Sequence, residues 1–170
     1  VPEGQITSGS LSGVLRFRSE TLDGVRNQLG QLALAMADSF NQQHREGFDL
    51  NGEQGGDFFS FSGARVVDNT RNTGDASLSV SYTDTSKVKA NDYRVEYDGA
   101  NWQVSRLPDN VKVNATAGKD AAGNPTLSFD GLEVSIDGNP QQKDSFTVKP
   151  VSDVAGNLKV AITDSAKIAA

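Results

Sequence analysis

The hydrophobic period of the sequence changes once along the chain, and this change limits the possible folds more than any other feature. Over residues 11–46 the apolar positions lie three or four residues apart, with Arg18 as the exception, which is typical of a helix packed along a narrow seam. The seam consists of Leu11, Leu15, Leu22, Val25, Leu29, Leu32 and Met36. From about residue 64 apolar and polar residues alternate, which is typical of half-buried strands. We therefore predict an α+β fold.

The helical stretch has recognisable ends but no partner within the sequence. Ser8 and Ser10 are possible N-caps, and Gly47 is a stop signal. Gly24 and Gly30 each cost about 1 kcal/mol relative to alanine inside a helix, so this helix needs packing for its stability. No second long heptad segment follows. We predict a coiled-coil-like helix of an incomplete helical domain, whose partner helices lie elsewhere in the full protein or in a neighbouring copy.

The alternating segments predict an inserted all-β domain, an antiparallel sandwich or barrel. The strand segments cover residues 78–82, 93–97, 102–104, 111–113, 127–129, 132–136 and 146–148, and the turn dipeptides are Asp98-Gly99, Asp130-Gly131 and Asp137-Gly138. Trp102 is expected to anchor the core. After Pro150 the pattern changes again: Asp153 is a candidate cap of a short helical turn, and Asp164 is a candidate cap of a helix that begins SAKIAA. We predict part of a helical rod-like domain with its linker over 1–57, an outer β-domain over 58–150, and a return segment toward the helical domain over 151–170.

The stretch GFDLNGEQGGDFFSF, residues 47–61, lies where the period changes and has two interpretations. As a calcium loop starting at Asp49, it would need glycine at position 6 and glutamate at position 12, but Gln54 and Ser60 stand there. We therefore interpret it as an interdomain joint that sets where the outer domain points. The joint residues are Gly47, Gly52, Gly55, Gly56, Phe58 and Phe59.

The composition argues against several classes of function. The 170 residues include no cysteine, which removes disulfides, thiol nucleophiles and thiolate metal sites. The net charge is −6 and Lys and Arg form no run, so we expect no nucleic-acid partner. No apolar stretch approaches the ~18 residues that can span a bilayer, so we expect no membrane insertion.

Candidate catalytic groups are weak. His44 is the one histidine, no serine or aspartate forms a motif with it, and we expect it to be solvated or to face a partner. The carboxylate pairs Asp109 with Asp120 and Glu133 with Asp137 match a glycosidase dyad in residue type alone. We predict no catalytic, cofactor-binding or metal-binding residue, no cofactor, and no enzymatic activity.

The segment SGVLRFRSETLDGVRNQLGQLALAMADSFNQQHREGFDLNGEQGGDFFSF strongly resembles the flagellar hook-associated protein 1 family, the first of the hook–filament junction proteins. The matching positions are Leu11–Phe17, Leu22–Asp23, Arg26–Asn27, Leu29–Gly30, Phe40–Asn41, Gln43–His44, Gly47, Asp49, Gly52, Gly55 and Asp57–Phe59. The segments NDYRVEYDGANWQV, LSFDGLEVSIDG, DSFTVKPVSD and ITDSAKIAA are similar to the inserted domain and its exit in enterobacterial-type members. One departure is Gly24, where proline is common.

The resemblance implies a secreted structural protein of the bacterial flagellum, of which this chain is an internal fragment. It implies export by the flagellar type III pathway, extracellular assembly at the distal end of the hook, and a role in joining hook to filament. The implied partners are copies of itself, the hook protein, the second junction protein and, for the full-length chain, an export chaperone. An alternative from the residues is an extracellular β-sandwich adhesin or carbohydrate-binding module on a helical stalk, and a hydrolase comes last.

Overall fold

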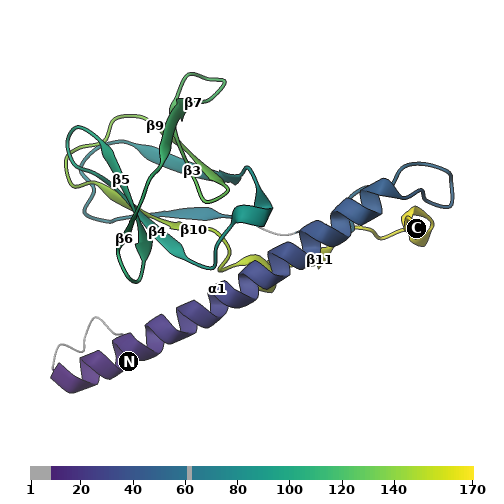
Figure 1. The fold of residues 1–170 in the computed structure, drawn as a ribbon, viewed down its shortest axis with the longest axis horizontal. Helices are drawn as coiled ribbons and strands as arrows, with labels where there is room; N and C mark the ends of the chain where they lie inside the picture. The colour runs from purple at the N-terminus through teal and green to yellow at the C-terminus, as the bar shows by residue number, and fades with distance from the viewer. Residues whose placement is uncertain (1–8, 61–62) are drawn as a thin grey trace.

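A single long helix forms one part of the molecule, and a β-domain packs against the middle of it (Figure 1). The computed structural model describes residues 9–60 and 63–170, and for residues 9–17 it describes the backbone alone. Helix α1 (Gly9–Glu46) has 38 residues and is therefore about 57 Å long. It continues through Gly24 and Gly30 without a break and ends before Gly47, as predicted. Ser8 lies outside the described residues.

The β-domain consists of two antiparallel sheets. The five-stranded sheet has the order β2 (Arg65–Asp68), β10 (Ser145–Lys149), β4 (Asp92–Tyr97), β5 (Trp102–Leu107) and β6 (Val111–Val113). The four-stranded sheet has the order β3 (Ser77–Tyr82), β9 (Leu132–Asp137), β8 (Pro125–Phe129) and β7 (Thr116–Lys119). The predicted α+β fold with an antiparallel β-domain is confirmed.

The two sheets enclose one apolar core. Alternate residues of β4, β9 and β10 point into it and are almost fully buried, among them Tyr93, Val134 and Phe146. Trp102 lies at the edge of this core, half-buried between Tyr97 and Phe146, with ring centroids 5.1 and 6.0 Å away. The core therefore depends on the alternation that the sequence displays.

A polar link joins the two sheets at one end of the core. The Tyr93 hydroxyl donates to Asp130 Oδ2 at 2.6 Å, and Arg106 forms an ion pair with the same carboxylate at 3.2 Å. Burial and the adjacent Asp130 raise the pKa of Tyr93, so its hydroxyl stays a donor. Asp130 lies in the β8–β9 turn with φ 46°, beside Gly131 with φ 76°. The Asp-Gly turn predicted from the sequence thus carries the link.

Two strands of the β-domain have no recognisable signal in the sequence. β7 is exposed at all four positions and β2 at three of its four. Without a buried face a strand has no apolar alternation to detect. The seven predicted strand segments correspond to β3, β4, β5, β6, β8, β9 and β10.

The chain leaves the helix and returns to it along the same path. The outgoing β1 (Phe59–Ser60) pairs antiparallel with the returning β11 (Lys159–Val160) in a small sheet of its own. Between the β-domain and β11 lies the short α2 (Val154–Asn157), and after β11 comes the 3₁₀ turn η3 (Ser165–Lys167). A second 3₁₀ turn, η2 (Thr85–Lys87), lies between β3 and β4. Over the described residues, none of the helices has both the length and the apolarity to cross a bilayer.

Candidate functional site

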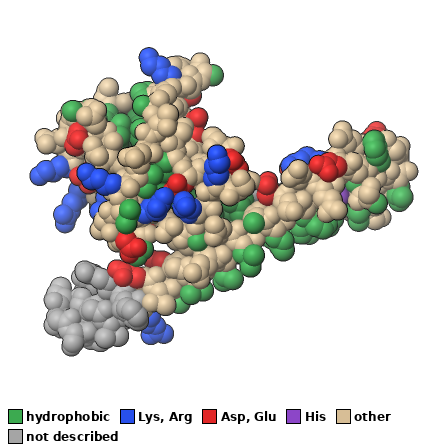
Figure 2. All heavy atoms as spheres, viewed as in Figure 1, with side chains coloured by type: hydrophobic (Ala, Val, Ile, Leu, Met, Phe, Trp, Pro, Cys, Tyr) green, Lys and Arg blue, Asp and Glu red, His purple; other side chains and the backbone are tan. Residues whose placement is uncertain are grey.

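The face of α1 that points away from the β-domain carries a row of uncovered apolar side chains. We call Leu22, Val25, Leu29, Leu32 and Met36 the apolar stripe. Their exposed fractions run from 48% at Val25 to 68% at Leu32. In Figure 2 hydrophobic side chains follow this edge of the helix. Leu11 and Leu15, which the sequence adds to the same seam, lie where side chains are not described.

The opposite face of α1 is covered by the chain itself. We call its members the buried stripe: Asn27, Gly30, Leu34, Ala37, Asn41 and His44. Each follows the one before it by three or four residues, and Asn27 and Leu34 come two residues after Val25 and Leu32. Two residues turn a helix by about 200°, so the two stripes lie on roughly opposite sides. Hydrophobic periodicity does not reveal this stripe because most of its members are small or polar, although the heptad spacing is present.

The predicted joint folds back along the end of α1 as a tight hairpin. Asp49 Oδ1 accepts the backbone N–H groups of Asn51 and Glu53 at 2.8 and 2.9 Å, so this carboxylate oxygen holds the turn. Gly52 adopts φ 79° in the turn, and Gly56 has open space around it. A Cβ on Gly55 would lie 2.2 Å from the His44 carbonyl oxygen. Glycine at position 55 therefore allows the hairpin to lie against the helix.

Asn41 and three phenylalanines attach the exit of the joint to the helix. Asn41 Oδ1 accepts the N–H groups of Phe58 and Phe59 at 2.9 and 2.8 Å, and its Nδ2 donates to the Phe59 carbonyl at 2.9 Å. The Phe40 ring lies 4.9 and 5.4 Å from the rings of Phe58 and Phe59. The structure thus places Phe58 and Phe59 against the helix, next to the end of the apolar stripe.

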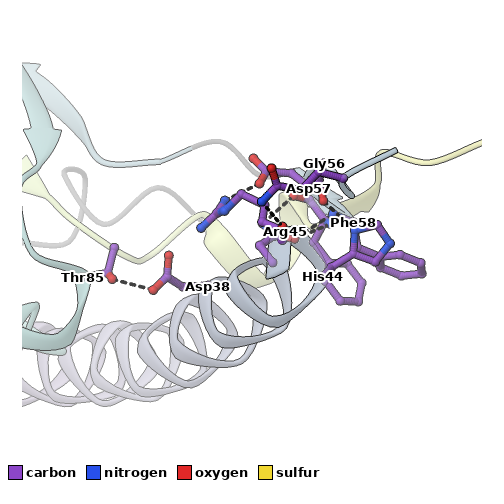
Figure 3. A network of polar contacts seen from close by, with 10 residues as sticks. Asp38, His44, Arg45, Gly56, Asp57, Phe58 and Thr85 are labelled. Carbon is purple, nitrogen blue, oxygen red and sulfur yellow. Dashed lines mark hydrogen bonds and ion pairs between the residues drawn. The ribbon is translucent and has the colours of Figure 1, made fainter. Parts of the chain in front are cut away.

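His44 connects the outgoing and returning segments, as Figure 3 shows for the outgoing side. Its Nδ1 lies 2.6 Å from the Gly56 carbonyl, and its Nε2 lies 2.8 Å from the N–H of Ala169. The ring is 4% exposed and packs against Phe58 with centroids 5.7 Å apart. The expectation of a solvated histidine is therefore wrong. Beside it, Arg45 forms an ion pair with Asp57.

The candidate carboxylates do not form a dyad, and one of them, Asp120, has structural partners. Asp120 accepts the backbone N–H groups of Asn124 and Ala122, which lower its pKa, and it also accepts the hydroxyl of Ser135. Glu133 and Asp137 are four residues apart on β9, about 13 Å along the strand, which is too far for a glycosidase dyad. Within the described part of the chain, no three metal-ligating side chains are grouped to hold an ion.

The fold and this surface define a class of protein: an α+β chain whose long helix bears an antiparallel β-domain on one face and leaves the other apolar. Residues 1–59 match the family model described as Flagellar hook-associated protein FlgK helical domain. Residues 67–150 match the model described as Flagellar hook-associated protein 1, D2-like domain. The chain belongs to the flagellar hook-associated protein 1 family, as the sequence motifs indicated.

Individual relatives agree with this assignment. The chain is 50% identical over 169 residues to flagellar hook-associated protein 1 of Escherichia coli K12, with 99% of this chain covered. It is 46% identical over 170 residues to the protein of the same name in Salmonella typhimurium, again with 99% covered. A solved structure of the flagellar hook junction protein FlgK from Burkholderia pseudomallei is similar over 100% of this chain, with 36% identity and a TM-score of 0.86. The chain spans 30% of the length of each of these three relatives.

Proposed function

We propose that this chain is part of a structural subunit of the bacterial flagellum that joins the hook to the filament, and that the apolar stripe is its assembly surface. The observation that carries the proposal is the exposure of five large apolar side chains in helical register on one face. Fully burying one such side chain contributes about 1.5–3 kcal/mol, so a face of this kind gains most when another helix covers it.

A groove beside the stripe supports helix packing in particular. It has a volume of about 430 Å³ and lies between α1 and α2, with Leu22, Val25 and Leu29 on the α1 side. In coiled-coil packing, a side chain of one helix inserts into a hole formed by its partner. Ser152 lines the same groove, and its buried Oγ has no hydrogen-bond partner among the residues that the structure describes. A partner that fills the groove would remove apolar surface from water and could satisfy this hydroxyl.

Three consecutive parts of the chain take different roles in the proposed subunit. Residues 1–57 belong to the inner helical domain with its linker, 58–150 form the outward β-domain, and 151–170 return toward the helical domain. The proposed partners of the full-length protein are copies of itself, the hook protein and the second junction protein, with an export chaperone before secretion. The assembly is extracellular and involves no enzymatic step.

The test is electron microscopy of purified hooks mixed with the full-length protein or with this 170-residue chain. We expect the full-length protein to add density at one end of the hook, because we expect it to supply the partner helices that the apolar stripe requires. We expect the chain alone to bind weakly or not at all. Hooks whose ends stay bare with folded full-length protein would contradict the proposed function.

A further inference from the structure

We infer that the orientation of the β-domain on α1 is set by a contact in the middle of the helix, centred on Gly30, rather than by the joint at the helix end. This goes beyond the proposed function, because it concerns how the outer part of the subunit is held relative to the inner part. It assigns a positioning role to the first four residues of the buried stripe, Asn27, Gly30, Leu34 and Ala37, and it does not depend on what covers the apolar stripe.

At Gly30 the helix lies directly against the backbone of Val151, in the segment that leaves the β-domain. A Cβ at this position would lie 1.8 Å from the Val151 carbonyl oxygen and 2.7 Å from its carbonyl carbon. Both atoms belong to the backbone directly after β10, and the Val151 side chain is fully buried in the core. Because these are backbone atoms, they cannot move aside as the end of a flexible side chain could. An alanine at position 30 would push the two elements apart by at least about 1 Å.

Three polar bonds surround this contact and come from different segments of the β-domain. Gln31 Nε2 donates to the Val88 carbonyl at 2.8 Å. The Thr85 hydroxyl donates to Asp38 Oδ2 at 2.8 Å, as Figure 3 shows.

Toward the start of the helix, Asn27 Nδ2 donates to Asp92 Oδ1 at 3.3 Å. Asp92 lies on β4, whereas Thr85 lies in η2 and Val88 follows η2. From Asn27 to Asp38 the helix advances about 16 Å. Contacts at separate heights on one helix face restrict both sliding and rotation of the domain, which a single contact does not.

Apolar packing joins the same contact to the core. Leu34 and Ala37 on the helix are 1% and 0% exposed, and Leu34 belongs to the same apolar cluster as the residues between the sheets. Val154 of α2 is buried in that cluster as well. The helix thus forms part of the hydrophobic core of the β-domain, so the domain cannot turn on the helix without exposing core residues.

The joint holds a different part of the molecule. Asn41 and His44 bind the outgoing segment to the helix end, and β1 pairs with β11 in a sheet separate from both sheets of the β-domain. These bonds connect the joint to the helix and to the return segment. They fix the path of the chain, and the direction of the β-domain is left to the contact around Gly30.

The experiment measures distances between the helix and the β-domain by double electron–electron resonance. The chain has no cysteine, so spin labels can be attached at Ser39→Cys on α1 and at Ala100→Cys or Ala121→Cys on the β-domain, three exposed positions. Gly30→Ala is compared with Gly24→Ala, which makes the same chemical change on the same helix. At Gly24 no atom of the described residues lies within 4 Å of the new Cβ. Asn41→Ala loosens the joint instead. Far-ultraviolet circular dichroism checks that each variant is folded.

We expect Gly30→Ala to shift or broaden both distance distributions by at least about 1 Å, and Gly24→Ala and Asn41→Ala to leave both unchanged. Unchanged distances in Gly30→Ala, or an equal shift in Asn41→Ala, would overturn the inference. If Gly30→Ala does not fold, the double variant Gln31→Ala with Asp38→Ala replaces it. Broader distributions in that variant support the inference, and unchanged distributions overturn it.

Discussion

The two bonds of His44 determine which of its nitrogens carries the proton. A backbone carbonyl can only accept, so Nδ1, which faces Gly56, must carry a hydrogen. A backbone N–H can only donate, so Nε2, which faces Ala169, must be unprotonated. We therefore predict that the ring is the neutral Nδ1–H tautomer, and that it attaches both the outgoing and the returning segment to the end of α1.

Replacing this ring with leucine removes both bonds and still fills much of the space that the ring occupies. His44→Leu leaves a donor and an acceptor of the backbone without partners, and an unsatisfied buried group costs about 1–3 kcal/mol. We expect the closed form of this segment to lose roughly 3 kcal/mol, which corresponds to about a 100-fold rise in its opening. The loss is local, because the core of the β-domain does not include this ring.

Amide hydrogen exchange by nuclear magnetic resonance measures this opening. The reporters are the N–H of Leu50, bonded to the Ala166 carbonyl at 3.0 Å, and the N–H of Ala161, bonded to the Phe58 carbonyl at 2.7 Å. Gln43→Leu, the same kind of change on an exposed neighbour, is the control. Unchanged exchange at both reporters in His44→Leu, or nitrogen shifts that show the Nε2–H tautomer in the unmodified chain, would refute the reasoning.

Other predictions concern buried and titrating side chains. In denaturant titrations of this chain, Leu34→Ala should lower the free energy of unfolding by about 2–5 kcal/mol. Leu32→Ala, on the exposed side of the same helix, should change it by less than about 0.5 kcal/mol. Equal losses in the two variants would contradict the assignment of the buried face. Burial raises the pKa of Tyr82 to about 12, and its hydroxyl donates to the Pro150 carbonyl at 2.5 Å. Stability should therefore fall as the pH rises from about 10 toward about 12, by at most about 2 kcal/mol, and the fall should be smaller in Tyr82→Phe. Backbone N–H groups of Gln141 and Thr73 lower the pKa of Asp144, so its contribution is complete above about pH 4 and is lost on further acidification; melting curves of Asp144→Asn should show a lower melting temperature at neutral pH and a weaker dependence on acid.

The helix could be predicted from the spacing of its apolar stripe, although that stripe is exposed in this chain. Most strands could be predicted because their burial follows the sequence period. Leu78 and Val80, or Tyr93 and Val95, alternate with polar residues since one side of each strand faces the core. The end of the return segment was less predictable. Asp164 does cap a turn, with Oδ1 accepting the Ala166 N–H at 3.0 Å, but the turn is a single 3₁₀ turn and not the expected helix.

The buried stripe of α1 could not be predicted because several of its residues pack through close backbone contact or side-chain hydrogen bonds and are not large apolar residues. By residue type Gly30 destabilises the helix. Its presence is explained by the Val151 backbone, which leaves no room for a Cβ. Asn27 and Asn41 look solvent-exposed by residue type, yet both are buried and bonded to other parts of the chain. Hydrophobic periodicity detects faces that need covering by apolar contact, and it misses faces covered through amides and close backbone approach.

The central claim is that the apolar stripe is an assembly surface, and its most direct test is the fraction of purified hooks that carry full-length protein at one end in electron micrographs. Leu29→Asp with Leu32→Asp places two charges in the stripe, and Gln28→Asp with Ala35→Asp places two on exposed neighbours outside it. We predict that the first pair abolishes binding to hook ends and that the second pair leaves it close to that of the unmodified protein, with both variants folded. Normal binding by the stripe variant would contradict the account.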